Sequence, residues 1–219
     1  IGDYVYWLKD RIAVEAIRLR LSDLTRAGEM RWAEAYFDDD YFYGATRMYA
    51  FSLVAESGEE HAAFADLARE VERIRRFGFT ESEFKRTVDN WRRWLTTLDV
   101  EDQDLKSWNF AEEYVRNFMY REPVPGVINE RVYIKNTLDG ISLDDLAKSA
   151  RSILADDEGF VAVRAKAAPT DGSISGKRFE ATLEGARAAA LEPLSPSALA
   201  SAGLFDGEPE GGSIVNQKQ

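Results

Sequence analysis

The sequence contains no cysteine and a single histidine, and both absences exclude kinds of chemistry. Without Cys, the chain has no disulfide, no thiolate zinc site and no Cys nucleophile. With His61 as the only His, a metal site built on several histidines cannot form within these 219 residues. The cellular compartment stays open, because a chain without Cys tolerates any redox environment.

The chain also lacks long hydrophobic runs and an excess of positive charge. No apolar run approaches the ~20 residues that span a bilayer, so we expect no membrane partner. The formal net charge is −11, and because an acidic chain repels phosphate backbones we expect no nucleic-acid partner. The first ten residues carry acidic side chains and no initiating Met, unlike a signal peptide. We expect that the chain was cut from a longer protein.

What is present is typical of a globular domain: 45% of the residues are apolar and 31% are charged. The length suits one large domain, or one domain and a tail. Helical periodicity predicts a first helix over residues 3–25. The period then changes to two over residues 31–37 and 46–55, which predicts two strands joined as a hairpin. The turn between them is expected at residues 38–44, which are rich in Asp and aromatic residues.

Helices dominate the remainder of the sequence. Capping patterns predict helix starts at Ser57 with Glu60, at Thr80 with Glu83 and, more weakly, at Ser142. Further helices are predicted over residues 102–119, 127–138, 143–154 and 178–191, another strand over 159–165, and a linker after residue 193. In the helix over 102–119, the spacing predicts these inward-facing residues: Leu105, Trp108, Ala111, Val115 and Phe118.

The order strand, strand, helices, strand predicts an α+β fold. We expect a two-layer sandwich, in which an antiparallel-rich sheet has helices packed on one face. Three strands are too few for a well-covered sheet, so we expect its first strands to precede Ile1.

Three groups of side chains are candidate sites. His61 follows two Glu residues, but Ser57 stands where an inverted zinc motif His-x-x-Glu-His needs its first His, which favours an exposed structural His. The consecutive acids of residues 38–40 favour a solvated turn over a calcium site, because neighbouring side chains on an extended chain diverge. Tyr41 and Tyr43 suit either peptide capture at a strand edge or contact with a neighbouring domain.

Several segments, in order, resemble the pitrilysin/insulinase family of zinc metallopeptidases. Residues 72–84 (ERIRRFGFTESEF) resemble its helix followed by Gly-Phe-Thr-Glu-x-Glu-Leu, with Phe84 in place of Leu. Residues 122–126 and 141–146 resemble its Pro-x-Pro-Gly and Ile-Thr-x-Glu-Asp elements. Upstream, residues 3–24 resemble a helix that ends in Arg-Leu-x-Glu-Leu, and the tail over 204–215 is similar to linkers of large bacterial members.

The resemblance implies a non-catalytic second repeat, truncated at its start, over residues 1–166, followed by a C-terminal helix and inter-domain linker over 167–219. The family's substrate-binding Arg and Tyr are absent, since Leu24 and Arg31 occupy their places. The fragment itself is expected to hold no cofactor and to be inactive, while zinc belongs to another domain of the parent protein. The expected partners are the other domains of the same polypeptide and a peptide substrate, with the bacterial periplasm as the favoured compartment.

The matching hairpin of some relatives holds the substrate's N-terminal end by its strand edge. Carried over, this implies substrate-binding residues at Asp38, Tyr41, Tyr43 and Gly44. Two alternatives remain open at this point: a peptidase-like binding or assembly protein that has lost catalysis, and an unrelated enzyme that uses carboxylates.

Overall fold

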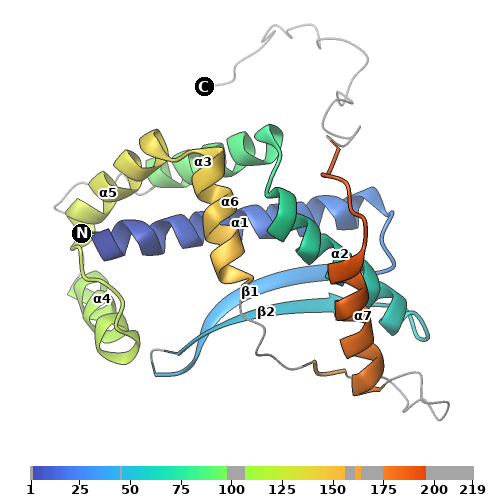
Figure 1. Cartoon of the computed structure of the whole chain (residues 1–219). Helices are drawn as coiled ribbons and strands as arrows, with labels where there is room; N and C mark the ends of the chain where they lie inside the picture. Colours follow the sequence, from blue (N-terminus) through green and yellow to red (C-terminus); the bar gives the residue numbers. More distant parts are fainter. Residues whose placement is uncertain (1, 45, 98–106, 156–160, 164–174, 196–219) are drawn as a thin grey trace, which may run out of the picture.

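The computed structural model describes residues 2–44, 46–97, 107–155, 161–163 and 175–195, which form a helix-rich α+β domain. Within these residues there are seven helices and one two-stranded antiparallel sheet, and most of the helices lie on one side of that sheet (Figure 1). The predicted fold class is therefore confirmed. No helix of the described part is long and apolar enough to cross a membrane.

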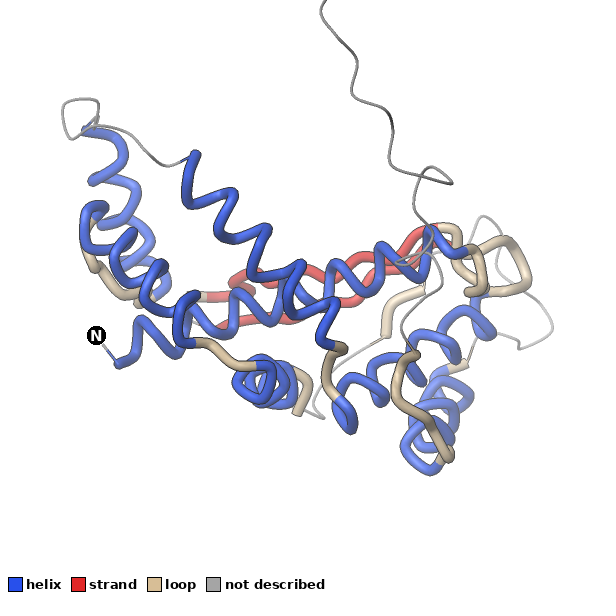
Figure 2. The backbone as a smooth tube through the Cα atoms, turned by 90° about the horizontal axis from the view of Figure 1, so that it is seen from above, coloured by secondary structure: helices blue, strands red, loops and turns tan. Residues whose placement is uncertain are grey.

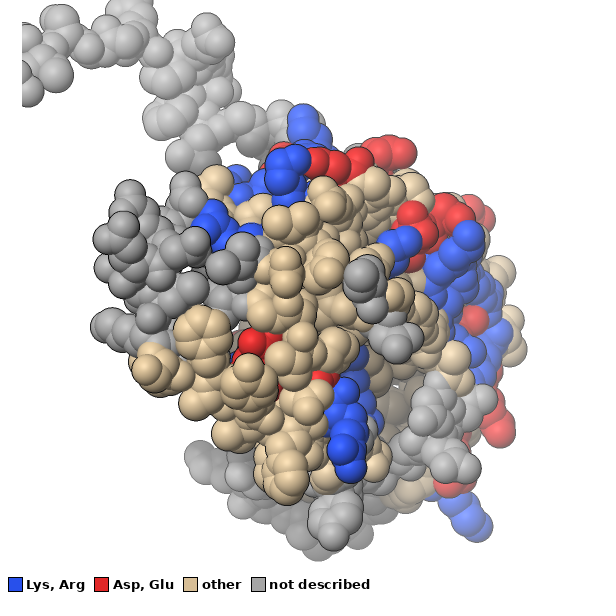
Figure 3. All heavy atoms as spheres, turned by 90° about the vertical axis from the view of Figure 1, so that its left-hand side faces the viewer, with Lys and Arg blue, Asp and Glu red and all other residues tan. Residues whose placement is uncertain are grey.

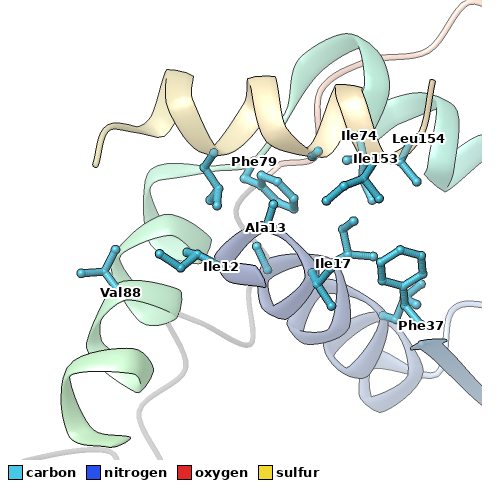
Figure 4. Close-up of a cluster of buried hydrophobic side chains, with 14 of the residues drawn as sticks. Ile12, Ala13, Ile17, Phe37, Ile74, Phe79, Val88, Ile153 and Leu154 are labelled. Carbon is cyan, nitrogen blue, oxygen red and sulfur yellow. The ribbon is translucent and has the colours of Figure 1, made fainter. Parts of the chain in front are cut away.

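Helix α1 (Gly2–Ala27) is the centre of the domain. The helical spacing predicts one apolar face at Leu8, Ile12, Ala16 and Leu19. The first three are almost completely buried, as is Ile17, whereas Leu19 is half-buried. The helix contacts β1 on one side and α3, α5 and α6 on others. Because α1 has neighbours on several sides, apolar residues occur on more than one of its faces. Side chains from several elements meet around Ile12, Ala13 and Ile17 (Figure 4).

The hairpin consists of β1 (Glu34–Tyr43) and β2 (Thr46–Val54), and it runs beneath α1 (Figure 2). Its register pairs Glu34 with Val54 and Tyr41 with Arg47. The prediction of a turn over residues 38–44 was wrong in extent, because the strand continues to Tyr43. Alternation explains this: Asp39 points toward basic partners, whereas Asp38 and Asp40 point to solvent, so each acid is satisfied in an extended backbone.

Helices α2 (Glu60–Phe77) and α3 (Glu81–Thr97) meet at Gly78. Gly78 has a φ of +68°, and a Cβ atom there would lie 2.8 Å from the Cβ of Ala147, so the position requires glycine. The capping box of Thr80 and Glu83 is confirmed: the Glu83 amide donates to the Thr80 hydroxyl at 3.2 Å, and the Thr80 amide donates to the Glu83 carboxylate at 2.7 Å.

Helices α5 (Val127–Gly140), α6 (Leu143–Ile153) and α7 (Gly176–Ala188) complete the packing. Ser142 and Asp145 form the predicted capping box of α6. The capping prediction at Ser57 was wrong. Helix α2 begins at Glu60 with Glu59 as its uncapped N-cap, and the Glu60 carboxylate accepts from the Gly58 amide at 2.9 Å instead.

Helix α4 (Ser107–Tyr120) forms, but the prediction of its inward face was wrong. Trp108, Val115 and Phe118 are exposed, at 59%, 58% and 79%. Ala111 is exposed as well, and Leu105 lies outside the described residues. The physical reason is the lack of a neighbour: none of the described elements covers that side of α4, which lies at the edge of the domain (Figure 1).

The predictions for the C-terminal part are tested only in places. Residues 161–163, the described part of the strand predicted over 159–165, are exposed and form no strand, so the prediction was wrong there. They pair with neither strand of the hairpin. The predicted boundary between residues 166 and 167 lies outside the described residues, and so does the linker predicted after residue 193, except for residues 194 and 195.

Candidate functional site

The two faces of β1 divide the predicted site residues between them. Asp38 is exposed, whereas Phe37 is buried and Tyr41 is half-buried on the side of the helices. Side chains at odd and even positions of a strand point to opposite faces. Asp38 and Tyr41 therefore do not converge on one pocket, and what the predicted residues share is the strand itself.

Asp39, which was not among the predicted site residues, is the best-connected acid of the hairpin. Its carboxylate accepts from Arg18 Nη2 and from Arg47 Nη2, both at 2.9 Å. Arg18 also donates from Nε to the Phe37 carbonyl at 2.8 Å. This arrangement ties β1 to α1 and to β2. The signal in the sequence was only an Arg on the polar face of the first helix, with no indication of its partner.

Tyr41 packs against α4 and is not free on the surface. Its ring stacks on Tyr120, with centroids 4.2 Å apart and planes 7° from parallel. Burial raises the pKa of the Tyr41 hydroxyl, and the nearby Glu122 carboxylate raises it further, against the opposing effect of Arg47. The hydroxyl thus stays protonated and acts as a packing and hydrogen-bonding group.

The tip of the hairpin carries the other two predicted residues. Tyr43 pairs with Thr46 across the turn, after an irregularity in the register between Tyr41 and Tyr43; its side chain lies outside the description. Gly44 is exposed with a φ of +52°, and nothing lies within 4 Å of the place where a Cβ would be. The left-handed backbone favours glycine there, and the open space leaves the tip accessible.

Both strands have an edge that no other described strand covers, because the sheet of the described residues has two strands. Such edges present backbone donors and acceptors that a further strand can pair with. On β1, the Phe37 carbonyl already accepts a hydrogen bond from Arg18 Nε.

A groove of about 330 Å³ lies beside the hairpin, between α1 and α3. Arg11 and Arg18 line it from α1, Trp91 and Trp94 from α3, and Asp39 reaches it from β1. Trp94 is 45% exposed and meets Trp91 edge to face at 5.3 Å. No local pattern in the sequence indicates the groove, because its two walls come from α1 and α3, which are far apart in the sequence.

The single His has a packing role in this structure. His61 is half-buried rather than exposed, which corrects the prediction. Its Nε2 lies 3.0 Å from the Thr182 hydroxyl, and its ring meets Phe179 of α7 edge to face. Burial, and then the charge of Arg178, lower the His61 pKa.

The donor set of the described residues does not fit a zinc ion. Among the described residues, no group of three or more His, Asp or Glu side chains is placed to hold a metal. His61 stands alone next to Phe179 and Thr182, without a second imidazole or an aimed carboxylate.

Comparison with known proteins identifies the fold. No family model matches the sequence, and no curated protein matches it. An insulinase family protease from Yersinia pestis superposes with a TM-score of 0.68 at 16% identity, over 84% of this chain and 39% of that chain. The first half of the periplasmic protease PqqL from Escherichia coli gives a TM-score of 0.66 at 12% identity, over 89% and 42%.

The ferredoxin protease FusC, solved in complex with Arabidopsis ferredoxin, is also similar, with a TM-score of 0.63 at 16% identity over 89% of this chain and 22% of that chain. This chain thus spans less than half the length of each of these structures. At these identities the likeness establishes the fold. The chain has the fold of an insulinase-type protease domain, which confirms at that level the resemblance found in the sequence.

Proposed function

We propose that this chain is a non-catalytic domain of a zinc-dependent endopeptidase, which helps to enclose the substrate chamber and aligns an extended peptide along its hairpin. The observation that carries the proposal is the fold: the neighbours are proteases, and the aligned part is a fraction of each. A fold alone does not imply a function. The support for peptide binding therefore comes from the geometry of the hairpin and the groove.

Zinc and its general base would come from another domain of the same polypeptide, since the donor set here does not fit the metal. When bound there, zinc would supply an activated water for peptide hydrolysis. This chain would contribute binding and positioning. A His-x-x-Glu-His motif elsewhere in the polypeptide is therefore a requirement of the proposal.

The open strand edges support capture of an extended peptide. An added strand gains affinity from main-chain hydrogen bonds and selectivity from pockets for alternate side chains. Gly44 leaves open space at the tip, and Asp38 offers a charged group on the outer face. The groove next to Asp39 adds an aromatic wall at Trp94, suited to a substrate side chain.

Backbone N-methylation of the substrate tests strand capture directly. In the complete polypeptide, a cleaved peptide methylated one amide at a time should lose affinity at alternate positions, because only alternate amides face the pairing edge. We expect KM to rise roughly tenfold at the sensitive amides, with kcat nearly unchanged. Uniform sensitivity, or none, would contradict strand capture.

A pair of glycine variants tests the location. Gly44→Pro should raise KM because proline cannot adopt the positive φ of the turn. Gly58→Pro is the matched control: Gly58 also has a positive φ, of +96°, and lies in the loop before α2. Equal kinetics of the two variants would exclude the hairpin. Peptide binding without any cleavage, together with a missing zinc motif, would instead indicate a peptidase-like binding protein.

A further inference from the structure

Helix α4 exposes an unusual amount of apolar surface for a helix of 14 residues. Large apolar or aromatic side chains occur along its whole length and are 39–79% exposed: Trp108, Phe110, Tyr114, Val115, Phe118 and Met119. We refer to these six residues as the α4 face. Exposed apolar residues are common singly, but a contiguous group on one element marks an interaction surface.

The attachments of α4 to the domain leave this face free. The Glu113 carboxylate accepts from the Gly126 amide at 2.8 Å, and Asn117 donates to the Glu122 carbonyl at 2.6 Å. The Tyr120 ring stacks on Tyr41. A helix of this length is marginal by itself, and tertiary packing of an apolar face normally stabilises it. Within the described residues, the α4 face receives no such packing.

The side chains of the α4 face are those that stable interfaces prefer. Trp, Tyr, Phe and Met are enriched in interface cores, whereas charged residues are depleted there. On this side of the molecule, uncharged residues form the largest part of the surface (Figure 3). Glu113 is buried, and Glu112 is paired with Arg116 at 3.3 Å. The complementary surface should therefore be apolar and low in charge.

We propose that the α4 face is the contact surface for a second folded domain of the same polypeptide. This inference rests on the proposed function, which supplies such a domain. The similar structures support it, because the aligned part covers only 39% of the Yersinia pestis chain and 42% of the PqqL chain, so this fold occurs there together with further protein.

Two other occupants fit the observations less well. An extended peptide pairs with free backbone groups, and a helix interior offers none. A second copy of this chain would bring two net charges of −11 together, which opposes self-association. A folded domain with an apolar patch meets neither objection.

Site-specific photo-cross-linking in the complete, purified polypeptide tests the inference. Phe118→p-benzoylphenylalanine keeps an aromatic side chain at the most exposed position of the α4 face. Lys148→p-benzoylphenylalanine is the control, on α6 with a side chain 67% exposed. We expect position 118 to cross-link, within one molecule, to a peptide outside these 219 residues, roughly fivefold or more above position 148, because cross-linking requires contact.

Each other result would overturn the inference. A covalent dimer joined at residues of this chain would identify a second copy as the occupant. Cross-links confined to the same 219 residues, or a yield no higher than at position 148, would show that no other domain covers the face. The outcome is independent of activity: an intramolecular cross-link in an inactive polypeptide refutes the peptidase proposal alone, and its absence in an active peptidase refutes this inference alone.

Discussion

The junction of α1, α2 and α3 buries charges, whereas α4 exposes aromatic rings, which is the reverse of what residue type alone suggests. At the junction, Arg20 and Glu70 are each 1% exposed and Glu83 is 6% exposed. We refer to these three residues as the Arg20 cluster. On α4, Phe118 is 79% exposed. The difference teaches that burial depends on available partners: the charges of the Arg20 cluster have partners within the chain, whereas no described element covers the exposed rings of α4.

The geometry of the Arg20 cluster explains how charges are tolerated there. Arg20 donates from Nε and Nη2 to the two Glu83 oxygens at 2.6 and 2.5 Å, and from Nη1 to Glu70 at 3.4 Å. Its guanidinium also lies 5.0 Å from the centre of the Phe79 ring. Burial by itself would raise the Glu83 pKa, but the hydrogen bonds and charge of Arg20 and the bonds from Thr80 outweigh it, so the pKa is lowered.

Removing the central charge should give the largest effect. Arg20→Met leaves Glu83 buried without its charged partner, while Glu70 keeps its ion pair with Arg73, and we expect the free energy of unfolding to fall by about 3–5 kcal/mol. Arg26→Met, on the same helix with a side chain 71% exposed, should cost less than about 1 kcal/mol. Urea unfolding of the chain measures both. Similar costs would mean that the Arg20 cluster is not a stabilising feature of the junction.

The cluster should also make the junction acid-sensitive. Because the Glu83 pKa in the folded chain is below its ordinary value of 4.5, the ionised form favours folding. This contribution is fully present above about pH 4.5 and is lost as the pH falls through the lowered pKa. Glu83→Gln should flatten that part of the stability curve. An unchanged acid slope in the variant would contradict the assignment.

The sequence could predict the local part of this junction and not its tertiary part. Thr80 and Glu83 are three residues apart, so the capping box follows from local spacing. The partner of Glu83 is 63 residues away, and no local pattern specifies it. Likewise, the period of α4 predicts which residues share a face, but not whether anything covers that face. For the candidate site, the pattern located the hairpin but missed the groove between α1 and α3.

Two glycines, one in each region, offer the next comparison. Gly78→Ala introduces both a strained φ and an overlap with Ala147, and should cost about 2–3 kcal/mol. Gly126, which precedes α5 and holds Glu113 of α4, has a similar φ of +78° but open space around it. Gly126→Ala should therefore cost only the backbone strain, about 1 kcal/mol. Equal losses in unfolding measurements would show that the contact with Ala147 relaxes freely.

The stacked pair of Tyr41 and Tyr120 joins the hairpin to α4, and the coupling energy of the pair can be measured. A double-mutant cycle with Tyr41→Leu and Tyr120→Leu should give a coupling energy of about 0.5–1.5 kcal/mol. Tyr114, on the same helix but 62% exposed, provides the control cycle with Tyr41, in which we expect a coupling near zero. A coupling energy of zero in both cycles would mean that the Tyr41–Tyr120 stack does not stabilise the contact between α4 and the hairpin.

The smallest effect is expected on the α4 face itself. Phe118→Ser in the 219-residue chain should change the free energy of unfolding by less than about 0.5 kcal/mol, because the ring is already exposed. Phe37, which is 1% exposed in β1, is the matched position: Phe37→Ser should cost about 3–5 kcal/mol. A loss above about 2 kcal/mol at Phe118 would mean that the chain's own residues cover the α4 face, and the contrast with the junction would fail. A small loss in this chain with a larger one in the complete polypeptide would mean that the same ring acquires its partner only when the other domain is present, just as Arg20 acquires its partners from α2 and α3.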